Sequence, residues 1–306
     1  MTAQVALPPA TETTPFATGD IIAGRYRMVA RIGCGDGPAE VWKADDLTLA
    51  VPVALKLVRS ATPAARTRLL REARLTRQVT HPSVCRVFDA GEADCTVFFS
   101  MELVEGEDLA VLLKRTGRLT SERVVRLAHQ LCAGLEAAHT RGVAHRSLSL
   151  GNILLDRDGQ VRITGFDLAL GTREPLPRAT RRADVHAIGA ILFELVTGRP
   201  LPATGPLPSP LAPDVCPELE QAVLGAIGLA PEDRLATVPA LAARLPRPVP
   251  TPAAVRRGPK ARTPNLRWLA DAAVVGVAGL RAALLLRGYD RRRDGAPEGA
   301  RLRPAA

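Results

Sequence analysis

Two short segments of the sequence hold polar side chains of the kinds that handle protons and metal ions. The first is His145-Arg146-Ser147-Leu148-Ser149-Leu150-Gly151-Asn152, and the second is Thr164-Gly165-Phe166-Asp167. Asn152 and Asp167 carry oxygens that could ligate a metal ion, although Asp167 can also be interpreted as a solvated turn residue. The hydroxyl of Ser147 cannot accept a proton at neutral pH without a base beside it. The first segment contains no carboxylate that could serve as that base.

A glycine-rich turn, Gly33-Cys34-Gly35-Asp36-Gly37, lies between two segments of alternating polar and apolar residues, 25–32 and 40–44. Backbone N–H groups in such turns can hold phosphate groups. Pro38 removes one of these N–H groups, and Asp36 adds a negative charge where a polyphosphate would lie. The turn therefore predicts a weakened grip on a triphosphate.

The elements that position these segments can be predicted from the hydrophobic pattern, which indicates a fold of class α+β. Alternating or short apolar segments predict five strands, at 25–32, 40–44, 51–58, 84–88 and 96–101. One helix is predicted among them, at 63–79, and further helices follow at 120–140, 183–197, 215–229 and 236–245. We therefore expect a bilobed fold, with a small five-stranded lobe at 21–104 and a larger, mainly helical lobe at 105–245.

Charge and cysteine content limit the partners and the compartment. The chain has 306 residues and a net charge of +10, of which +8 arises after residue 249, from twelve Arg and Lys against four Asp and Glu. A basic tail on a nearly neutral body suggests an acidic partner or a membrane surface. We expect no nucleic acid, because no DNA-binding motif accompanies the charge. Five cysteines without C-x-x-C spacing favour a reducing, cytoplasmic compartment over a disulfide or zinc framework.

The segments outside the two lobes are predicted to be connectors and a C-terminal anchor. Residues 1–20, rich in Thr, Pro and Ala, are interpreted as a disordered lead-in without a signal peptide. Residues 246–267 are predicted to be a Pro- and Arg-rich linker, 268–287 an apolar helix and 288–306 a basic tail. The apolar segment is a candidate membrane anchor, and the alternatives are a helix on the membrane surface and a soluble tail.

Eight segments occur in an order that resembles one protein family. They are Val53-Ala54-Leu55-Lys56, Arg71-Glu72-Ala73-Arg74, His81-Pro82-Ser83-Val84, Met101-Glu102-Leu103-Val104-Glu105-Gly106, His139 to Arg146, Asn152-Ile153-Leu154-Leu155, Ala183 to Gly189 and Pro231-Glu232-Asp233-Arg234. Over residues 25–245 they are similar to the eukaryotic-like Ser/Thr protein kinases of bacteria. The resemblance implies a kinase fold, in which two lobes enclose a cleft. Such kinases often carry one transmembrane helix after the linker, which favours anchoring of 268–287 in the inner membrane.

The resemblance also implies a nucleotide site. Its candidate residues are Ile32, Gly33, Gly35, Val41, Ala54, Lys56, Glu72, Met101, Glu102, Val104 and Leu154. In the family, the lysine matching Lys56 holds the phosphates and pairs with the glutamate matching Glu72, while the hinge that begins at Met101 would hydrogen-bond adenine. The alternative is that these residues are ordinary core side chains in a collapsed cleft. ATP is therefore an implied cofactor, with both interpretations open.

The sequence departs from the family at the positions that carry out phosphoryl transfer. Ser147 stands at the position of the catalytic base and Ser149 at that of the lysine that follows, so no catalytic residue is intact. Gly165 replaces the metal-binding aspartate. Asn152 is retained but neutral, and Asp167 would lie about 6–7 Å from the lost position on an extended backbone. Both are weak metal ligands, and we expect no Mg²⁺.

The segment that would dock a substrate is also shortened. Only 19 positions lead from Gly165 to Asp184, and no Ala-Pro-Glu occurs. Arg234 resembles the arginine that pairs with the missing glutamate, so it needs another partner. We therefore expect a pseudokinase, an interaction module that contacts another signalling protein such as an active kinase, with or without ATP. The alternatives are an unconventional Ser/Thr kinase that recruits Asp167 and a degenerate kinase homologue without a function.

Overall fold

The computed structural model describes residues 16–34, 39–59, 62–93, 96–166, 177–202, 207–228 and 234–248. These residues belong to one unit, Met1–Val249, whereas Pro250–Ala306 form a second unit that lies outside the described residues. The predicted helix at 268–287 and the tail at 288–306 thus lie outside the described residues, as do most of the lead-in and the linker. In the described part of the chain, no helix is long and apolar enough to cross a membrane.

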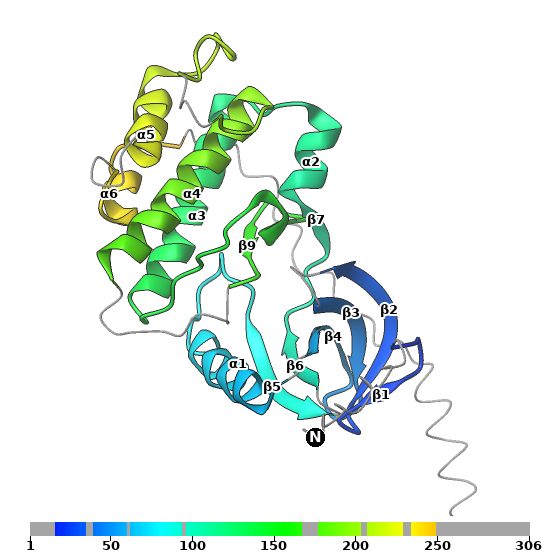
Figure 1. Ribbon diagram of the computed structural model, residues 1–306. Coiled ribbons are helices and arrows are strands. Elements are labelled where there is room, and N and C mark those ends of the chain that lie inside the picture. Colours follow the sequence, from blue (N-terminus) through cyan, green and yellow to red (C-terminus); the bar gives the residue numbers. More distant parts are fainter. Residues whose placement is uncertain are drawn as a thin grey trace, which may run out of the picture. The chain divides into compact units, whose positions relative to one another are not determined.

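An antiparallel sheet of six strands forms the N-terminal lobe, in the order β1-β2-β3-β4-β6-β5 (Figure 1). The strands are β1 (Ile21–Ile22), β2 (Tyr26–Cys34), β3 (Ala39–Asp46), β4 (Val51–Arg59), β5 (Val87–Ala93) and β6 (Thr96–Met101). The bilobed α+β fold is confirmed, but the sheet has six strands rather than the predicted five. The additional strand β1 is two residues long, too short for a periodic pattern, and pairing of Ile21 with Arg27 fixes it at the sheet edge.

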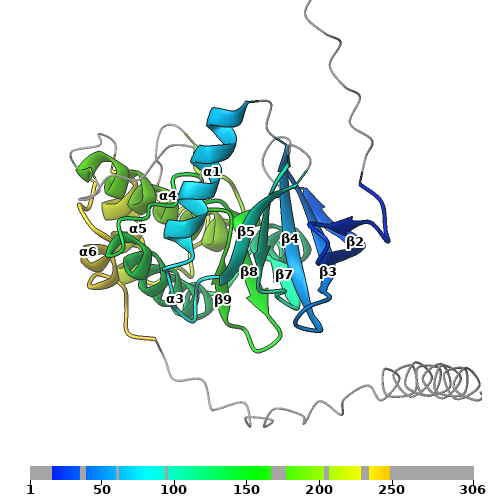
Figure 2. The ribbon, with the colours of Figure 1, turned by 90° about the horizontal axis from the view of Figure 1, so that it is seen from below.

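The central strands β4 and β6 are largely buried on both faces, because both of their sides are mainly apolar. Every residue of β6 is buried, and on β4 the neighbouring residues Ala54 and Leu55 belong to two different hydrophobic clusters. Helix α1 (Pro63–Thr76) covers the face that carries Ala54, and its Ala73 packs into that cluster (Figure 2). The helix begins with a Thr62 cap that accepts from Ala65 N. It ends three residues before the predicted position 79, because the last N–H groups bond three residues back, as in a turn.

The predicted strand at 84–88 was wrong, because the strand in this part of the chain is β5, at Val87–Ala93. Val84 and Cys85 leave the sheet and pair with Ile163 of the helical lobe, where Cys85 N donates to Ile163 O at 2.8 Å. The strand begins instead at Val87 and continues through polar residues, where its backbone pairs with β6. Backbone pairing at a sheet edge needs no apolar alternation, so the hydrophobic pattern could not locate this strand.

Within the described residues, the C-terminal lobe consists of five helices, one 3-10 turn and a small sheet. The helices are α2 (Leu109–Thr116), α3 (Ser121–His139), α4 (Arg178–Thr197), α5 (Pro217–Ile227) and α6 (Val238–Ala242), and the turn is η1 (Leu150–Asn152). The sheet has the order β7 (Gly106–Asp108), β8 (Ile153–Asp156) and β9 (Val161–Ile163). It places η1 and the residues after β9 next to the N-terminal lobe, since Ile163 is already paired with that lobe through Val84.

The helix termini show which local signals the sequence carries. Thr120 caps α3, as predicted, by accepting from Arg123 N at 3.4 Å, and Gly198, with φ of +72°, ends α4. However, α4 begins at Arg178, five residues before the predicted start at 183. Pro177 at its N-cap makes no side-chain cap, and the arginine-rich first turns follow no apolar period. The sequence therefore carried no start signal there.

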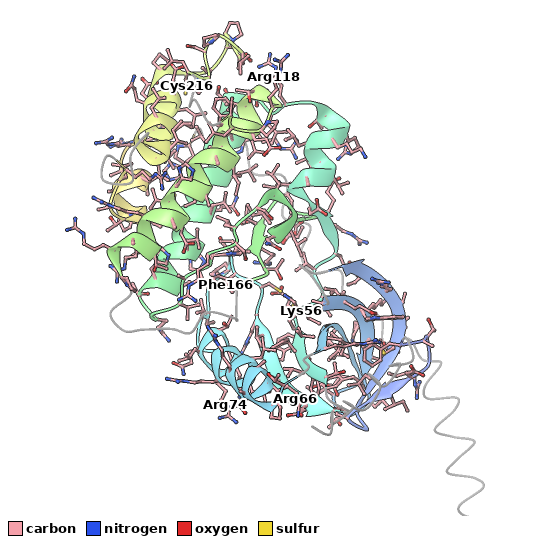
Figure 3. The ribbon with its side chains drawn as sticks, viewed as in Figure 1. Lys56, Arg66, Arg74, Arg118, Phe166 and Cys216 are labelled. Atoms are coloured by element: carbon pink, nitrogen blue, oxygen red, sulfur yellow. The ribbon has the colours of Figure 1, made fainter. Side chains whose placement is uncertain are left out.

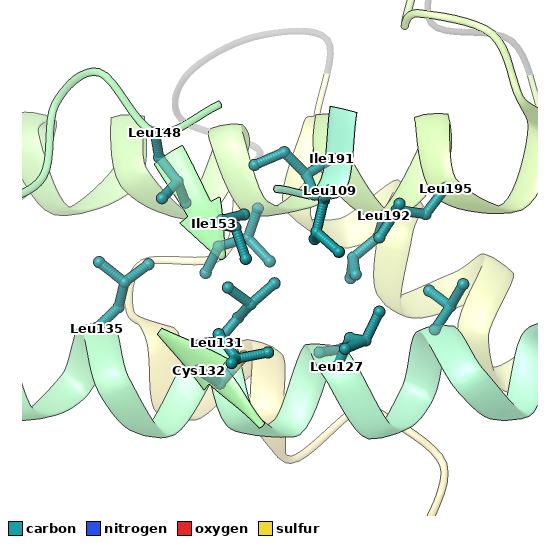
Figure 4. Close-up of a cluster of buried hydrophobic side chains, with 14 of the residues drawn as sticks. Leu109, Leu127, Leu131, Cys132, Leu135, Leu148, Ile153, Ile191, Leu192 and Leu195 are labelled. Atoms are coloured by element: carbon teal, nitrogen blue, oxygen red, sulfur yellow. The ribbon is translucent and has the colours of Figure 1, made fainter. Parts of the chain in front are cut away.

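The core of the C-terminal lobe lies between α3 and α4 (Figure 4). Leu127 of α3 lies opposite Leu192 of α4, and Leu135 lies opposite Leu148. Leu131 of α3 and Ile153 of β8 fill the space between them. Leu131 and Ile153 are fully buried. This cluster fixes the position of β8, and with it the polar residues on either side of β8.

Replacing Leu131 with alanine is expected to lower the free energy of unfolding by about 2–5 kcal/mol, because the substitution leaves a cavity among residues that cannot collapse into it. Leu49 is 61% exposed, so Leu49→Ala serves as the matched control and should change stability by no more than about 0.5 kcal/mol. Urea denaturation of the full chain measures both. Equal midpoints for the two variants would show that the α3–α4 contact is not the core.

Candidate functional site

A cavity of about 210 Å³ lies where the sheet meets the helical lobe. The predicted nucleotide residues that the structure describes all line it: Ile32, Gly33, Val41, Ala54, Lys56, Met101, Glu102, Val104 and Leu154. Gly35 and the side chain of Glu72 lie outside the described residues, so the expected pairing with Lys56 stays a prediction. The fold thus brings together residues from β2, β3, β4, the hinge after β6, and β8.

Sequence reasoning missed part of the cavity wall. Cys85, Leu103, Asp108, Gly151 and Thr164 also line it. Asp108 caps α2 by accepting from Val111 N at 2.8 Å, and an aspartate directly before an apolar helical segment was a signal that could have revealed it. Burial raises the pKa of the Cys85 thiol to about 12, so this residue is neutral and contributes an apolar wall.

A second, smaller cavity of about 40 Å³ lies behind the first. The two cavities share Lys56, Cys85, Met101, Thr164 and Gly165. Ala73 and Thr76 of α1 close the smaller cavity on one side, and Phe166 lines it as well. Figure 3 shows Lys56 on β4 and Phe166 near the junction of the two lobes. Helix α1 is thereby in contact with the space next to the main cavity.

The carboxylate of Asp184 holds the backbone of the His145–Asn152 segment in place. Its Oδ2 accepts from His145 N (2.9 Å) and from His139 Nε2 (2.7 Å), and its Oδ1 accepts from Arg146 N (2.7 Å). Asp184 is only 1% exposed. Arg146 has a φ of +67°, a conformation that is unfavourable for a residue with a side chain and needs such support.

The pKa values of Asp184 and His145 are both lowered in this network, for different reasons. Burial acts to raise the pKa of Asp184, but hydrogen bonds from His139 and from the backbone of His145 and Arg146 outweigh it and hold that pKa below its usual value. Burial lowers the pKa of His145, so the imidazole is neutral at pH 7. Its Nε2–H donates to Thr164 O at 2.8 Å, and its ring lies 4.7 Å from that of Phe166. This bond connects the network to the residue before Gly165.

The residue at the base position, Ser147, is not arranged to accept a proton. Its hydroxyl donates to Gly165 O at 3.4 Å, and its own carbonyl accepts from Asn152 Nδ2 at 3.0 Å. A hydroxyl that donates to a carbonyl has no base to activate it. Ser149 is exposed and lies outside the cavity wall.

The side chain of Asn152 occupies the space beside Gly165. Gly165 has a φ of +74°, and a Cβ there would come within 2.7 Å of Asn152 Cγ and closer still to its Oδ1. Asn152 is held in this position by its bond to Ser147 O, while its carbonyl accepts from Thr164 N at 2.9 Å. Among the described residues, no group of three His, Cys, Asp or Glu could hold a metal ion. Asp167 lies outside the described residues.

Arg234, which the sequence left without a partner, also has a place. Its Nε donates to Gly228 O at 3.3 Å, at the end of α5. The neighbouring His186 of α4 contacts Ile227 O at 3.0 Å. In this structure Arg234 thus bonds to the C-terminal end of α5, and His186 joins α4 to the same end.

The comparisons with known proteins agree with this geometry. Residues 26–177 match the family model of the protein kinase domain. The chain contains a protein kinase domain. It is similar to the serine/threonine-protein kinase PknA of Mycobacterium tuberculosis, with 33% identity over 245 residues that cover 67% of this chain and 57% of PknA. It is also similar to PknH of Mycobacterium bovis, with 34% identity over 257 residues that cover 72% of this chain and 43% of PknH. The chain thus spans about half the length of these curated relatives.

A solved structure supports the fold independently. The crystal structure of Rad53 1-466 in complex with AMP-PNP superposes with a TM-score of 0.62 at 20% identity, covering 71% of this chain and 64% of the Rad53 chain. The kinase fold that the sequence predicted is therefore confirmed, and so is the distant homology to bacterial Ser/Thr kinases. At this level of identity the match concerns the fold alone.

Alanine at position 165 is expected to destabilise the protein by about 1–3 kcal/mol, because it forces a side chain into a positive-φ position and against Asn152. Gly151 is the matched control: it is exposed, and nothing lies within 4 Å of a Cβ placed there. Thermal denaturation should show a lower melting temperature for Gly165→Ala than for Gly151→Ala. When Asn152→Ala is also present, Gly165→Ala should lower the melting temperature by less. An equal decrease in melting temperature would disprove the contact between the Asn152 side chain and position 165.

The variant Asp184→Asn is expected to lose about 3 kcal/mol at neutral pH, because an amide presents a donor to N–H groups that need an acceptor. The depressed pKa makes the carboxylate's contribution complete above its unfolded-state pKa of about 3.9 and progressively lost as pH falls below it. Urea denaturation as a function of pH should therefore show the gap between wild type and variant narrowing only below about pH 4. Asp158→Asn, at an exposed turn, is the control, and its free energy of unfolding should equal that of wild type at every pH.

Proposed function

We propose that this chain is a pseudokinase that binds an adenine nucleotide without Mg²⁺ and acts as a signalling interaction module. The observation that carries the proposal is the contact between Asn152 and Gly165. At the place where the family holds its metal aspartate there is a glycine, and a neutral amide fills the adjacent space. Phosphoryl transfer depends on positioning and on neutralising charge, and both the base and the metal ligand are replaced here.

The apolar end of the cavity supports nucleotide binding. Ile32, Val41 and Leu154 form its walls, and the hinge residues Glu102 and Val104 lie at its edge. A concave apolar slot with a few polar groups at its edge is the usual form of a small-molecule site. The cavity volume of about 210 Å³ is below the roughly 300 Å³ at which ligand pockets usually begin, so it can enclose only part of a nucleotide.

The described residues around Asn152 and Gly165 do not fit Mg²⁺. This ion prefers carboxylate and phosphate oxygens in an octahedral arrangement. Asn152 offers one neutral oxygen, and its amide nitrogen is already engaged with Ser147 O. We therefore derive no step through a metal ion.

The partner and the location are part of the same proposal. A kinase domain that does not transfer phosphate can still act by binding other proteins. The proposed partner is another signalling protein, such as an active kinase. The body is proposed to be cytoplasmic, with 268–287 as the candidate anchor in the membrane.

ATP in the presence of EDTA is expected to raise the melting temperature by about 5 °C or more at a hundredfold excess over its dissociation constant. Mg²⁺ should not increase this shift, and no radiolabelled phosphate should reach the chain or a generic substrate. Lys56→Met is expected to reduce the shift, because Lys56 lines the cavity. The matched variant Lys43→Met, on the neighbouring strand and outside the cavity wall, should preserve it.

The result can also favour one of the two alternatives. Mg²⁺-dependent transfer that disappears in Lys56→Met would establish an unconventional kinase. A chain without a cooperative melting transition would point to a degenerate homologue. A cooperative transition whose melting temperature ATP does not raise would support an interaction module that binds no nucleotide.

A further inference from the structure

The described wall of the main cavity has no surplus of positive charge for a chain of phosphates. Its charged side chains are those of Lys56, Glu102 and Asp108. Glu102 pairs with Arg162, which lies outside the wall, at 3.5 Å. Asp108 accepts from Val111 N, and within the described residues no salt bridge involves it. The positive charge of the one lysine in this wall is therefore offset by the carboxylate of Asp108.

Protein kinases balance the phosphates of ATP with more positive charge than this wall supplies. In that family, metal ions bridge the phosphates and act together with the lysine. The described residues around Asn152 and Gly165 do not fit such an ion. Without the ion, each phosphate added to a ligand adds negative charge that the described wall does not balance.

The polar end of the cavity offers hydrogen-bond acceptors rather than free side-chain donors. Asn152 Nδ2 donates to Ser147 O at 3.0 Å, which leaves its side-chain oxygen beside Gly165. The hydroxyl of Ser147, beside the cavity, donates to Gly165 O at 3.4 Å, and that of Thr164 donates to Met101 Sδ at 4.0 Å. Phosphate oxygens are acceptors and need donors, whereas the hydroxyl groups of a nucleoside can donate to the oxygens found here.

The glycine-rich turn adds no basic side chain to this site. Gly33 and Val41 line the cavity, and the sequence between them, 34–40, contains Asp36 and Glu40 but no Lys, Arg or His. Pro38 in the same segment has no N–H group to offer to a phosphate. The sequence of the turn thus agrees with the charge of the described wall.

The size and the apolar wall of the cavity favour the uncharged part of a nucleotide. The volume of about 210 Å³ can enclose only part of such a ligand. Ile32, Val41 and Leu154 suit the base, because burying a charged group without a partner is unfavourable. The enclosed contacts therefore favour the base, and the phosphates bring charge that is not balanced.

We infer that this site selects an adenine ligand of low charge, namely adenosine or its monophosphate, over ADP and ATP. The inference rests on the proposed function, and it names the class of adenine compound that the proposed site takes. Discrimination arises from the number of phosphates, since all four compounds share the base and the sugar.

The test measures binding of radiolabelled adenosine to the full chain by equilibrium dialysis in EDTA, with unlabelled adenosine, AMP, ADP and ATP as competitors. AMP is expected to displace adenosine at a concentration within about threefold of that needed for adenosine itself, and ATP should need at least about tenfold more. The ratio between ATP and adenosine should fall as salt rises, because salt screens the repulsion. Competition reports only on the adenosine site, so ATP that binds to the basic tail does not contribute.

A single substitution tests whether charge causes the discrimination. Asp108→Asn removes a negative charge from the wall, and asparagine caps helices about as well as aspartate, so α2 should be preserved. The affinity for ATP relative to adenosine should rise about threefold. The control Asp158→Asn makes the same change in net charge at an exposed turn outside the wall, and it should leave this ratio unchanged.

The outcomes separate this inference from the proposed function. Displacement by ATP at a lower concentration than by AMP, or equal displacement by all four compounds, would overturn the inference and leave the proposed adenine site in place. If adenosine does not bind while ATP raises the melting temperature, the inference alone fails. If neither compound binds, the nucleotide-binding part of the proposed function fails with it.

Discussion

The rest of this domain depends on one buried carboxylate. Asp184, near the start of α4, accepts three hydrogen bonds, two from backbone N–H groups and one from the imidazole of His139. An ionised group in such a dry position is stable only when donors surround it, and here the donors come from α3 and from the segment that follows it. The same bonds hold Arg146 at a positive φ, a conformation the chain would otherwise leave.

From this carboxylate, a series of bonds reaches the floor of the cavity. Its contact with the backbone of His145 orients an imidazole that donates to Thr164 O, which fixes the residue before Gly165. None of these bonds takes part in phosphoryl transfer, and none requires a metal ion or a nucleotide. These bonds therefore hold α3, α4 and the residues after β9 together whether or not the domain transfers phosphate.

The cavity has an apolar end and a polar end, which depend on the fold to different degrees. Its apolar end is made of side chains that also serve the sheet and its clusters, such as Ala54 and Met101, so changing them would harm the fold. Its polar end holds Asn152 and Gly165, which are both bonded to Ser147 beside the cavity. A substitution at the apolar end would therefore disturb both the fold and the cavity, whereas a substitution at the polar end would mainly disturb the cavity.

Much of this could be predicted from the sequence, and the failures have physical causes. The kinase order of segments placed Lys56, Met101 and Leu154 around one cavity, because the motifs fix the topology and the topology fixes proximity. Strand β1 and the start of α4 escaped prediction, because a two-residue strand and an arginine-rich helix start leave no periodic or capping signal. The contact of Asn152 with Gly165 depends on a backbone angle and a side-chain rotamer, which no pattern of residue types encodes.

That contact has a consequence for any attempt to place a carboxylate at position 165. The amide of Asn152 lies beside this glycine and bonds to Ser147 O. A substitution of Gly165 by aspartate alone would meet an occupied space at a positive φ, so the amide would have to move in the same step. Two neighbouring positions must therefore change together where one change would be enough on an open backbone.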